Sequence, residues 1–255
     1  MLIVFAMFIL GLLLGFVGAG GAGTVIAVLT VVFGIPIHTA LGTSLSAMVF
    51  TTLSGAYSHF REENVVLKSG IAVGVFGAAG AFAGVRIAVL LPANELKWLT
   101  ACMLFVCAIL LWLRMFLSSK GIFSCIENKS APVGLKFWLT AAGLGIFTGV
   151  LSGTFGIGAT PFIQIGLLVL FSMSLPQSAG TTMLVILPIA VMGGLGYLTV
   201  GHFDTTLLIE VVSGLMSGTY IGAKFTKRLH PTILKTAMVG VPVVGGLLLL
   251  FGSGK

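Results

Sequence analysis

The sequence predicts an all-α, polytopic membrane protein built from two inverted repeats. Three observations lead to this fold class: the composition, a glycine-rich interruption that occurs twice, and the distribution of Lys and Arg along the chain. Of the 255 residues, 58% are apolar and 7% are charged, whereas a soluble domain carries roughly a quarter charged residues. The apolar runs are continuous rather than alternating, which favours helices over a transmembrane β-barrel.

A glycine-rich motif interrupts a long apolar run once in each half of the chain. The first copy extends from Gly18 to Thr24, and the second extends from Gly153 to Ala159. Irregular backbone at membrane depth is tolerated only where protein buries it or a watery cavity meets it. Paired interruptions at corresponding places in two repeats are typical of the binding site of a transporter.

Turn and charge signals divide each half into five apolar segments. A full span needs about 20 residues; the first two segments of each half are shorter than this, and the last three reach it. Short segments beside a glycine-rich break indicate half-helices or a hairpin that dips into the membrane. The segments are 2–17, 22–33, 39–58, 69–91 and 95–116 in the first half, and 137–151, 157–171, 178–200, 206–226 and 232–251 in the second.

Further landmarks recur in the same order and indicate a tandem duplication. We therefore predict a first transmembrane repeat over 1–117, a cytoplasmic linker over 118–136 and a second transmembrane repeat over 137–255. The apolar N-terminal segment lacks a positive n-region, so we expect it to be a retained membrane segment. The matching landmarks are Leu41–Ser44 with Ala179–Thr182, each after a proline turn, His59–Phe60 with His202–Phe203, and Gly80–Gly84 with Gly218–Gly222.

The distribution of Lys and Arg tests whether the repeats are parallel or inverted. Five segments per half is an odd number, so the second half enters the membrane from the opposite side. With the linker in the cytoplasm, ten basic residues lie inside and three outside, as the positive-inside rule requires. We predict inverted halves with both termini outside. The inside residues are Arg61, Lys68, Arg114, Lys120, Lys129, Lys136, Lys224, Lys227, Arg228 and Lys235; the outside residues are Arg86, Lys97 and Lys255.

Several function classes are disfavoured by the same sequence. The net charge of +7 reports topology and does not indicate nucleic-acid binding. The three cysteines have no accompanying His or acidic cluster, so we expect no metal and no cofactor. A serine-protease motif around Ser152 would need glycine at position 150, which is Val150. We therefore expect no enzyme.

The breaks themselves predict a site for a small anion. After each break, a half-helix presents unsatisfied backbone N–H groups and its positive dipole end, and glycine lets a ligand approach closely. Neighbouring hydroxyl and amide groups add neutral donors. The alternatives are that the glycines serve only packing and that the hydroxyls bond their own helix carbonyls. The candidate substrate-binding residues are Gly20, Gly21, Gly23, Thr24, Thr43, Ser44, Gly156, Gly158, Thr160, Gln164, Thr181 and Thr182.

Other polar residues have simpler explanations. Glycine stripes in segments 69–91 and 206–226 predict close helix packing. Arg86 and Lys224 are expected to snorkel to the interface, with attraction of an anion as the alternative. His38, His59 and His202 lie at turns or loops, where each could titrate near neutral pH, and the sequence favours none of the three.

The chain resembles the TauE/SafE sulfite-exporter family in three features that occur in the same order. These are the doubled break, the proline turns followed by Leu41-Gly42-Thr43-Ser44 and Ala179-Gly180-Thr181-Thr182, and the stretches 80–92 and 218–231. The resemblance covers about residues 10 to 250. The chain departs from the family pattern at Ala22 and Ala159, where the family is denser in glycine, and at Thr182, where the family prefers serine.

The resemblance implies a multi-pass protein of a bacterial cytoplasmic (inner) membrane. It also implies transport of a sulfur-containing anion, sulfite or an organosulfonate such as sulfoacetate, across that membrane. We expect a secondary transporter that exports its substrate by alternating access, since the chain contains no nucleotide-binding motif. The alternatives are an anion channel, a transporter of another small anion or with uptake direction, and a non-transporting subunit or sensor. The expected partners are the small anion and the lipid bilayer, with a homodimer as a further alternative to a monomer.

Overall fold

The computed structural model describes residues 1–17, 22–119, 132–226 and 231–252, and every regular element within these ranges is a helix. Ten helices follow one another along the described chain. They are α1 (Leu2–Val17), α2 (Ala22–Val31), α3 (Ile37–Arg61), α4 (Leu67–Leu90), α5 (Ala93–Ser119), α7 (Leu135–Phe155), α8 (Thr160–Leu170), α9 (Leu175–Thr199), α10 (Thr205–Thr226) and α11 (Pro231–Phe251).

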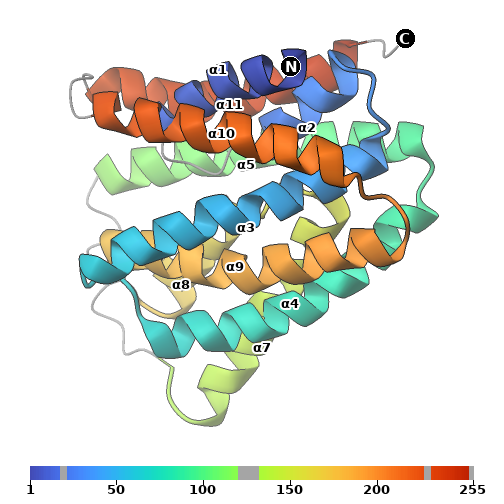
Figure 1. Ribbon diagram of the computed structural model, residues 1–255. Coiled ribbons are helices and arrows are strands. Elements are labelled where there is room, and N and C mark those ends of the chain that lie inside the picture. Colours follow the sequence, from blue (N-terminus) through green and yellow to red (C-terminus); the bar gives the residue numbers. More distant parts are fainter. Residues whose placement is uncertain (18–21, 120–131, 227–230, 253–255) are drawn as a thin grey trace.

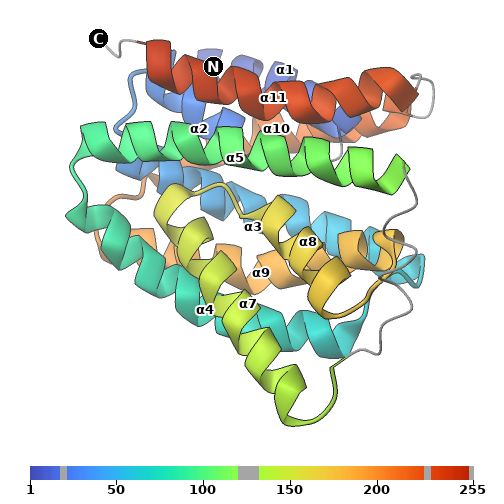
Figure 2. The same cartoon turned by 180° about the vertical axis from the view of Figure 1, so that it is seen from behind.

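The helices form two bundles that lie one above the other (Figures 1 and 2). The upper bundle, as oriented in Figure 1, contains α1, α2, α5, α10 and α11, and the lower bundle contains α3, α4, α7, α8 and α9. The most extensive helix contacts lie within these bundles. Each bundle combines helices from both halves of the sequence, so the repeats interlock rather than form separate domains in space.

Glycine allows the closest helix pairs in each bundle. In the lower bundle, a Cβ added at Gly149 of α7 would overlap the backbone of Gly77 on α4. In the upper bundle, a Cβ at Gly218 of α10 would overlap the carbonyl oxygen of Phe8 on α1. The predicted glycine stripes are thus confirmed as surfaces where backbones approach each other, as small residues permit between membrane helices.

Equivalent helices of the two halves run in opposite directions. Along α3 and α9, Gly42 lies against Tyr197 and Gly55 lies against Met183, so these third helices cross antiparallel. The fifth helices, α5 and α11, are antiparallel too, because Lys97 donates to the Gly252 carbonyl. The pairing of α4 with α7 has its counterpart in the pairing of α10 with α1. These features are in keeping with inverted repeats, whose boundaries at 117 and 137 stay a prediction.

Four helices among the described residues are long and apolar enough to cross a membrane: α4, α7, α9 and the part of α5 up to Arg114. Together with the shorter apolar helices, they make this a multi-pass membrane protein. The first helix of the second half, α7, is longer than the expected segment 137–151, at 21 residues. The 25-residue α3 is not among the four, since its Thr, Ser and Gly residues make it less apolar.

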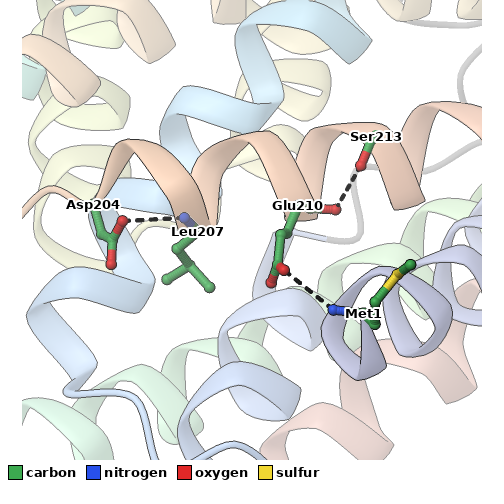
Figure 3. A network of polar contacts seen from close by, with 5 residues as sticks. All are labelled: Met1, Asp204, Leu207, Glu210 and Ser213. Carbon is green, nitrogen blue, oxygen red and sulfur yellow. Dashed lines mark hydrogen bonds and ion pairs between the residues drawn. The ribbon is translucent and has the colours of Figure 1, made fainter.

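Local sequence determines where several helices begin. A capping box starts α9, because Ser174 Oγ accepts from the Gln177 N–H while Gln177 Oε1 accepts from the Ser174 N–H. Asp204 Oδ1 accepts from the Leu207 N–H at the start of α10 (Figure 3). On the next turns of α10, Glu210 lies 3.2 Å from the Met1 ammonium and so joins α10 to the start of α1.

Candidate functional site

The second glycine-rich break is a four-residue turn between α7 and α8. Gly156, Gly158 and Ala159 all have positive φ angles, of 68°, 70° and 45°. Only glycine adopts this region without strain, so the conformation of Ala159 is a local cost of the turn. The predicted break began at Gly153, but Gly153–Phe155 continue the α7 helix. The irregular backbone is therefore shorter than predicted and lies over 156–159.

The turn places the N-terminus of α8 in the protein interior. Its N-cap residue, Ala159, has no side chain that can accept from the first backbone N–H groups, and proline occupies the first turn. The neighbouring Thr160 hydroxyl is buried and has no hydrogen-bond partner among the described residues. Unsatisfied N–H groups, the positive end of the helix dipole and an unpartnered hydroxyl thus occur together.

A small cavity of about 40 Å³ lies beside this helix end, between the upper and lower bundles. The lower bundle contributes the break and the first turns of α8. The upper bundle contributes α2, α5 and α11, and α5 supplies one continuous face of its helix. The lining residues are Gly23, Leu104, Cys107, Leu111, Arg114, Ile157, Thr160, Pro161, Gln164, Met238 and Pro242.

The charged residue of this cavity is Arg114. Its Nη1 donates a short hydrogen bond to Gln164 Oε1 on α8, so the pair connects the two bundles. We counted Arg114 among the basic residues of the cytoplasmic loops. The loop position is wrong, because Arg114 lies within α5 and lines the cavity, whereas its side of the membrane stays a prediction. The signal was available in the sequence: Leu104, Cys107, Leu111 and Arg114 share one helical face, and the last of them is a cation inside an apolar segment.

The start of α2 approaches the second break beside the cavity. Gly20 and Gly21 lie outside the described residues, but Gly23 is in the first turn of α2. A Cβ at Gly23 would overlap Leu104 of α5 and lie 3.1 Å from Ile157 Cγ2 in the second break. Leu104 is 3% exposed. It lines the cavity where α2, α5 and the second break approach each other.

The remaining candidate residues are distributed around this site rather than gathered in it. Thr24 is buried on α2, and the Ser44 hydroxyl donates to the Ala22 carbonyl at 3.0 Å, which ties α3 to the start of α2. Thr43 is fully buried and its hydroxyl has no partner among the described residues. A Cβ at Gly156 would lie 2.6 Å from Leu41 Cδ2, and one at Gly158 would overlap Met48.

The threonines of α9 already have partners in the protein. The Thr181 hydroxyl accepts from the Val66 N–H at 3.0 Å, and the Thr182 hydroxyl donates to the Ser178 carbonyl at 2.6 Å. Of the predicted residues, Gly23, Thr160 and Gln164 line the cavity. A role of any of the candidates in binding substrate stays a prediction.

Comparison with known proteins shows which family the chain resembles along nearly its whole length. The model of the sulfite exporter TauE/SafE family matches residues 3–249. The chain is 53% identical over 251 residues to the probable membrane transporter protein YdhB of Bacillus subtilis, covering 98% of this chain and all of the relative. It is 26% identical to the probable membrane transporter protein MJ0441 of Methanocaldococcus jannaschii, covering 98% and 94% of the two chains. No solved structure matches the chain.

Proposed function

The chain belongs to the TauE/SafE family of membrane transporters, and from this premise we propose that it exports a small sulfur-containing anion, sulfite or an organosulfonate such as sulfoacetate. The observation that carries the proposal is the position of Arg114. Its guanidinium lines a cavity between the two bundles, opposite Gln164 and beside the N-terminus of α8.

The electrostatics of the cavity favour an anion. A cation inside a membrane helix costs about 2.5–3.5 kcal/mol on insertion scales, and the partner of Arg114 is a neutral amide rather than a carboxylate. The positive end of the α8 dipole adds to this uncompensated positive potential. A bound anion would neutralise the charge of Arg114 and the positive end of the α8 dipole, so it would lower the electrostatic free energy of the site.

The donors also suit the shape of an oxyanion. A guanidinium presents several N–H groups in a planar fork that can contact two oxygens of one ligand. The Thr160 hydroxyl and the first N–H groups of α8 can contact a third oxygen from the opposite bundle. Sulfite and sulfonate groups each carry three oxygens on one sulfur. Such a ligand would be held from both bundles at once.

Unequal packing of equivalent helices supports alternating access. The contact between α11 and α2 is more extensive than that between their counterparts α5 and α8, and α4 packs on α9 more extensively than α10 packs on α3. In an inverted repeat, exchange of two such unequal arrangements converts one orientation of the site into the other. We propose that this exchange changes contacts across the cavity and within each bundle, so that α8 approaches α5 while α2 separates from α11 and α9 from α4.

Flux in proteoliposomes tests the transport activity. We expect saturable counterflow of labelled sulfite or sulfoacetate by the purified protein. Conductance far above the turnover of a carrier would instead support an anion channel, and absence of flux for every small anion tested would contradict transport of this class.

The substitution Arg114→Gln tests the site. It removes the charge that attracts the anion while keeping a hydrogen-bonding side chain, so we expect saturable counterflow to be lost, with partial activity in Arg114→Lys. The matched control is Arg86→Gln on α4, since the Arg86 guanidinium lies 5.4 Å from the Phe82 ring and outside the cavity lining. Wild-type counterflow in Arg114→Gln would remove Arg114 from the mechanism.

A further inference from the structure

The two bundles are connected by three described chain segments at one end of the molecule. Residues 32–36 link α2 to α3, residues 91–92 link α4 to α5, and residues 200–204 link α9 to α10. All three connections lie on the right-hand side of Figure 1. Any change in the angle between the bundles must bend the chain at this end, so contacts among these connections influence the motion.

Two histidines meet at this junction. His38, in the first turn of α3, stacks on His202 of the 200–204 connection, with ring centroids 5.0 Å apart and an interplanar angle of 26°. The Nε2 of His38 lies 3.1 Å from the Ala88 carbonyl oxygen in the last turn of α4. The pair therefore brings together all three chain segments that join the bundles, and it contains one residue from each half of the sequence.

The pair is also connected to the glycine break. The backbone N–H of His202 donates to the Tyr197 carbonyl at 3.1 Å, and the carbonyl of His202 lies against Gly42 of α3. The hydroxyl of fully buried Tyr197 donates to the Gly153 carbonyl at 3.1 Å, three residues before Gly156. A displacement of His202 thus has a short path of contacts to the turn that positions α8.

The stacked arrangement depends on the protonation state of the rings. Two neutral imidazoles can stack, but two imidazolium ions at this separation repel each other. Burial, and secondly the nearby charge of His38, lower the pKa of His202 below its ordinary value of 6.5. A lowered pKa means that the folded protein favours neutral His202, so the contact is fully present above pH 6.5 and is lost as the pH falls through the lowered pKa.

The other charged groups on the adjoining elements have different positions or partners. Asp204 caps α10 through Oδ1, and Arg86 on α4 lies over the Phe82 ring. In the first turns of α5, Lys97 donates to the Gly252 carbonyl, while Glu95 lies one turn from the 91–92 connection. Within the described ranges no ion pair joins any of them to His38 or His202.

We propose that the His38–His202 pair is a proton-binding site that controls the angle between the two bundles. Protonation of both imidazoles separates the start of α3 from the 200–204 connection and opens this end of the protein. The positive-inside topology places this end outside the cell, so acidification there favours the open arrangement. Only the consequence for flux rests on the proposed transport of a sulfur anion; proton binding and the opening itself do not.

A distance measurement tests the opening without any substrate. Spin labels at Leu90, at the end of α4 in the lower bundle, and at Thr205, at the start of α10 in the upper bundle, are both at exposed positions. They would report the separation of the bundles in a variant whose three cysteines are replaced by alanine. We expect the distance to lengthen between pH 8 and pH 5, and to stay constant over this range when His202→Gln is added. A distance that does not change with pH in the protein with both histidines would overturn the proposal.

A second measurement follows the stability of the purified protein. We expect the apparent melting temperature to fall on acidification from pH 8 to pH 5.5, and to fall less in His38→Gln and His202→Gln. His59→Gln is the matched control, because His59 lies in the last turn of α3, away from the junction, with its Nδ1 3.8 Å from Glu62 Oε2. Equal losses in the wild type and in whichever of the two variants folds would overturn the proposal. Loss of sulfite flux with a retained pH-dependent distance would contradict the proposed substrate alone.

Discussion

At the scale of single residues, the candidate site is asymmetric although the sequence motif is doubled. The cation and the amide of the cavity, Arg114 and Gln164, have apolar residues or glycine at the corresponding places of the other repeat. The sequence could predict Thr160 and Gln164 because they follow the break directly. We missed Arg114 although it shares a helical face with other cavity residues of α5, because a cation near a segment end also fits a cytoplasmic loop.

The buried hydroxyls of Thr160 and Thr43 both lack a hydrogen-bond partner among the described residues, but only Thr160 lines the cavity. Comparing them distinguishes a contact with substrate from a role in packing. We expect Thr160→Val to weaken sulfite or sulfoacetate binding by about ten- to a hundredfold, since a hydrogen bond to a charged group contributes about 1.5–3 kcal/mol. Thr160→Ser should keep most of the affinity. Thr43→Val is the control, because Thr43 is fully buried and lies outside the cavity lining. Binding is measured by thermal shift over a range of anion concentrations. Equal effects of the two valine variants would remove Thr160 from the site.

At the scale of elements, the sequence predicted the helices well and the length of the break less well. The boundaries of α2 and α8 lie close to the expected short segments. The end of α7 was predicted too early, since its last turn includes Gly153. In isolation such a glycine favours irregular backbone, but here it lets α7 approach α4, where a Cβ would overlap the backbone of Ala81. Periodicity along one segment carries no information about that neighbouring helix.

The glycine contacts between α4 and α7 can be tested by two substitutions on one helix. We expect Gly149→Ala to destabilise the protein by about 1–3 kcal/mol, the usual cost of overpacking, because the added methyl group would overlap the backbone of Gly77. Gly143→Ala on the same helix meets no atom within 4 Å, so its higher helix propensity should leave stability unchanged or raise it by up to about 1 kcal/mol. Chemical or thermal unfolding in detergent measures both, and equal effects would contradict close packing as the function of Gly149.

Leu104 of α5 lines the cavity where α5 meets the start of α2 and the second break. We expect Leu104→Ala to extend the cavity past Gly23 and Ile157 and to speed modification of Cys107, which lies one turn along α5, by a small thiol reagent. Leu96→Ala is the control, since Leu96 is fully buried on the same helix but outside the cavity lining. Both variants lose a buried side chain at a cost of about 2–5 kcal/mol. Faster modification in both would assign the effect to general loosening instead of the cavity.

At the scale of the whole molecule, the repeat was evident from the sequence, but the partition into bundles was not. The duplicated landmarks and the distribution of basic residues relate one half to the other. They do not determine which helices pack together, because helix pairing depends on surface fit between distant segments. The structure places α1 with α10 and α4 with α7, so that each bundle draws on both halves. The cavity is then an interface between bundles and can change shape as a whole.

The unequal packing of equivalent helices predicts the geometry of the second state. If the two arrangements exchange, α5 and α8 approach each other around Arg114 and Gln164 while α2 and α11 separate. Spin labels at Trp112 and Val169 report the first distance, and labels at Val28 and Leu247 report the second. We expect the first to shorten and the second to lengthen in the same fraction of molecules when sulfite is added, because one exchange of equivalent contacts produces both changes. Distances that change in the same direction would contradict an exchange of equivalent contacts, since the inverted relation between α5–α8 and α2–α11 requires one pair to close as the other opens.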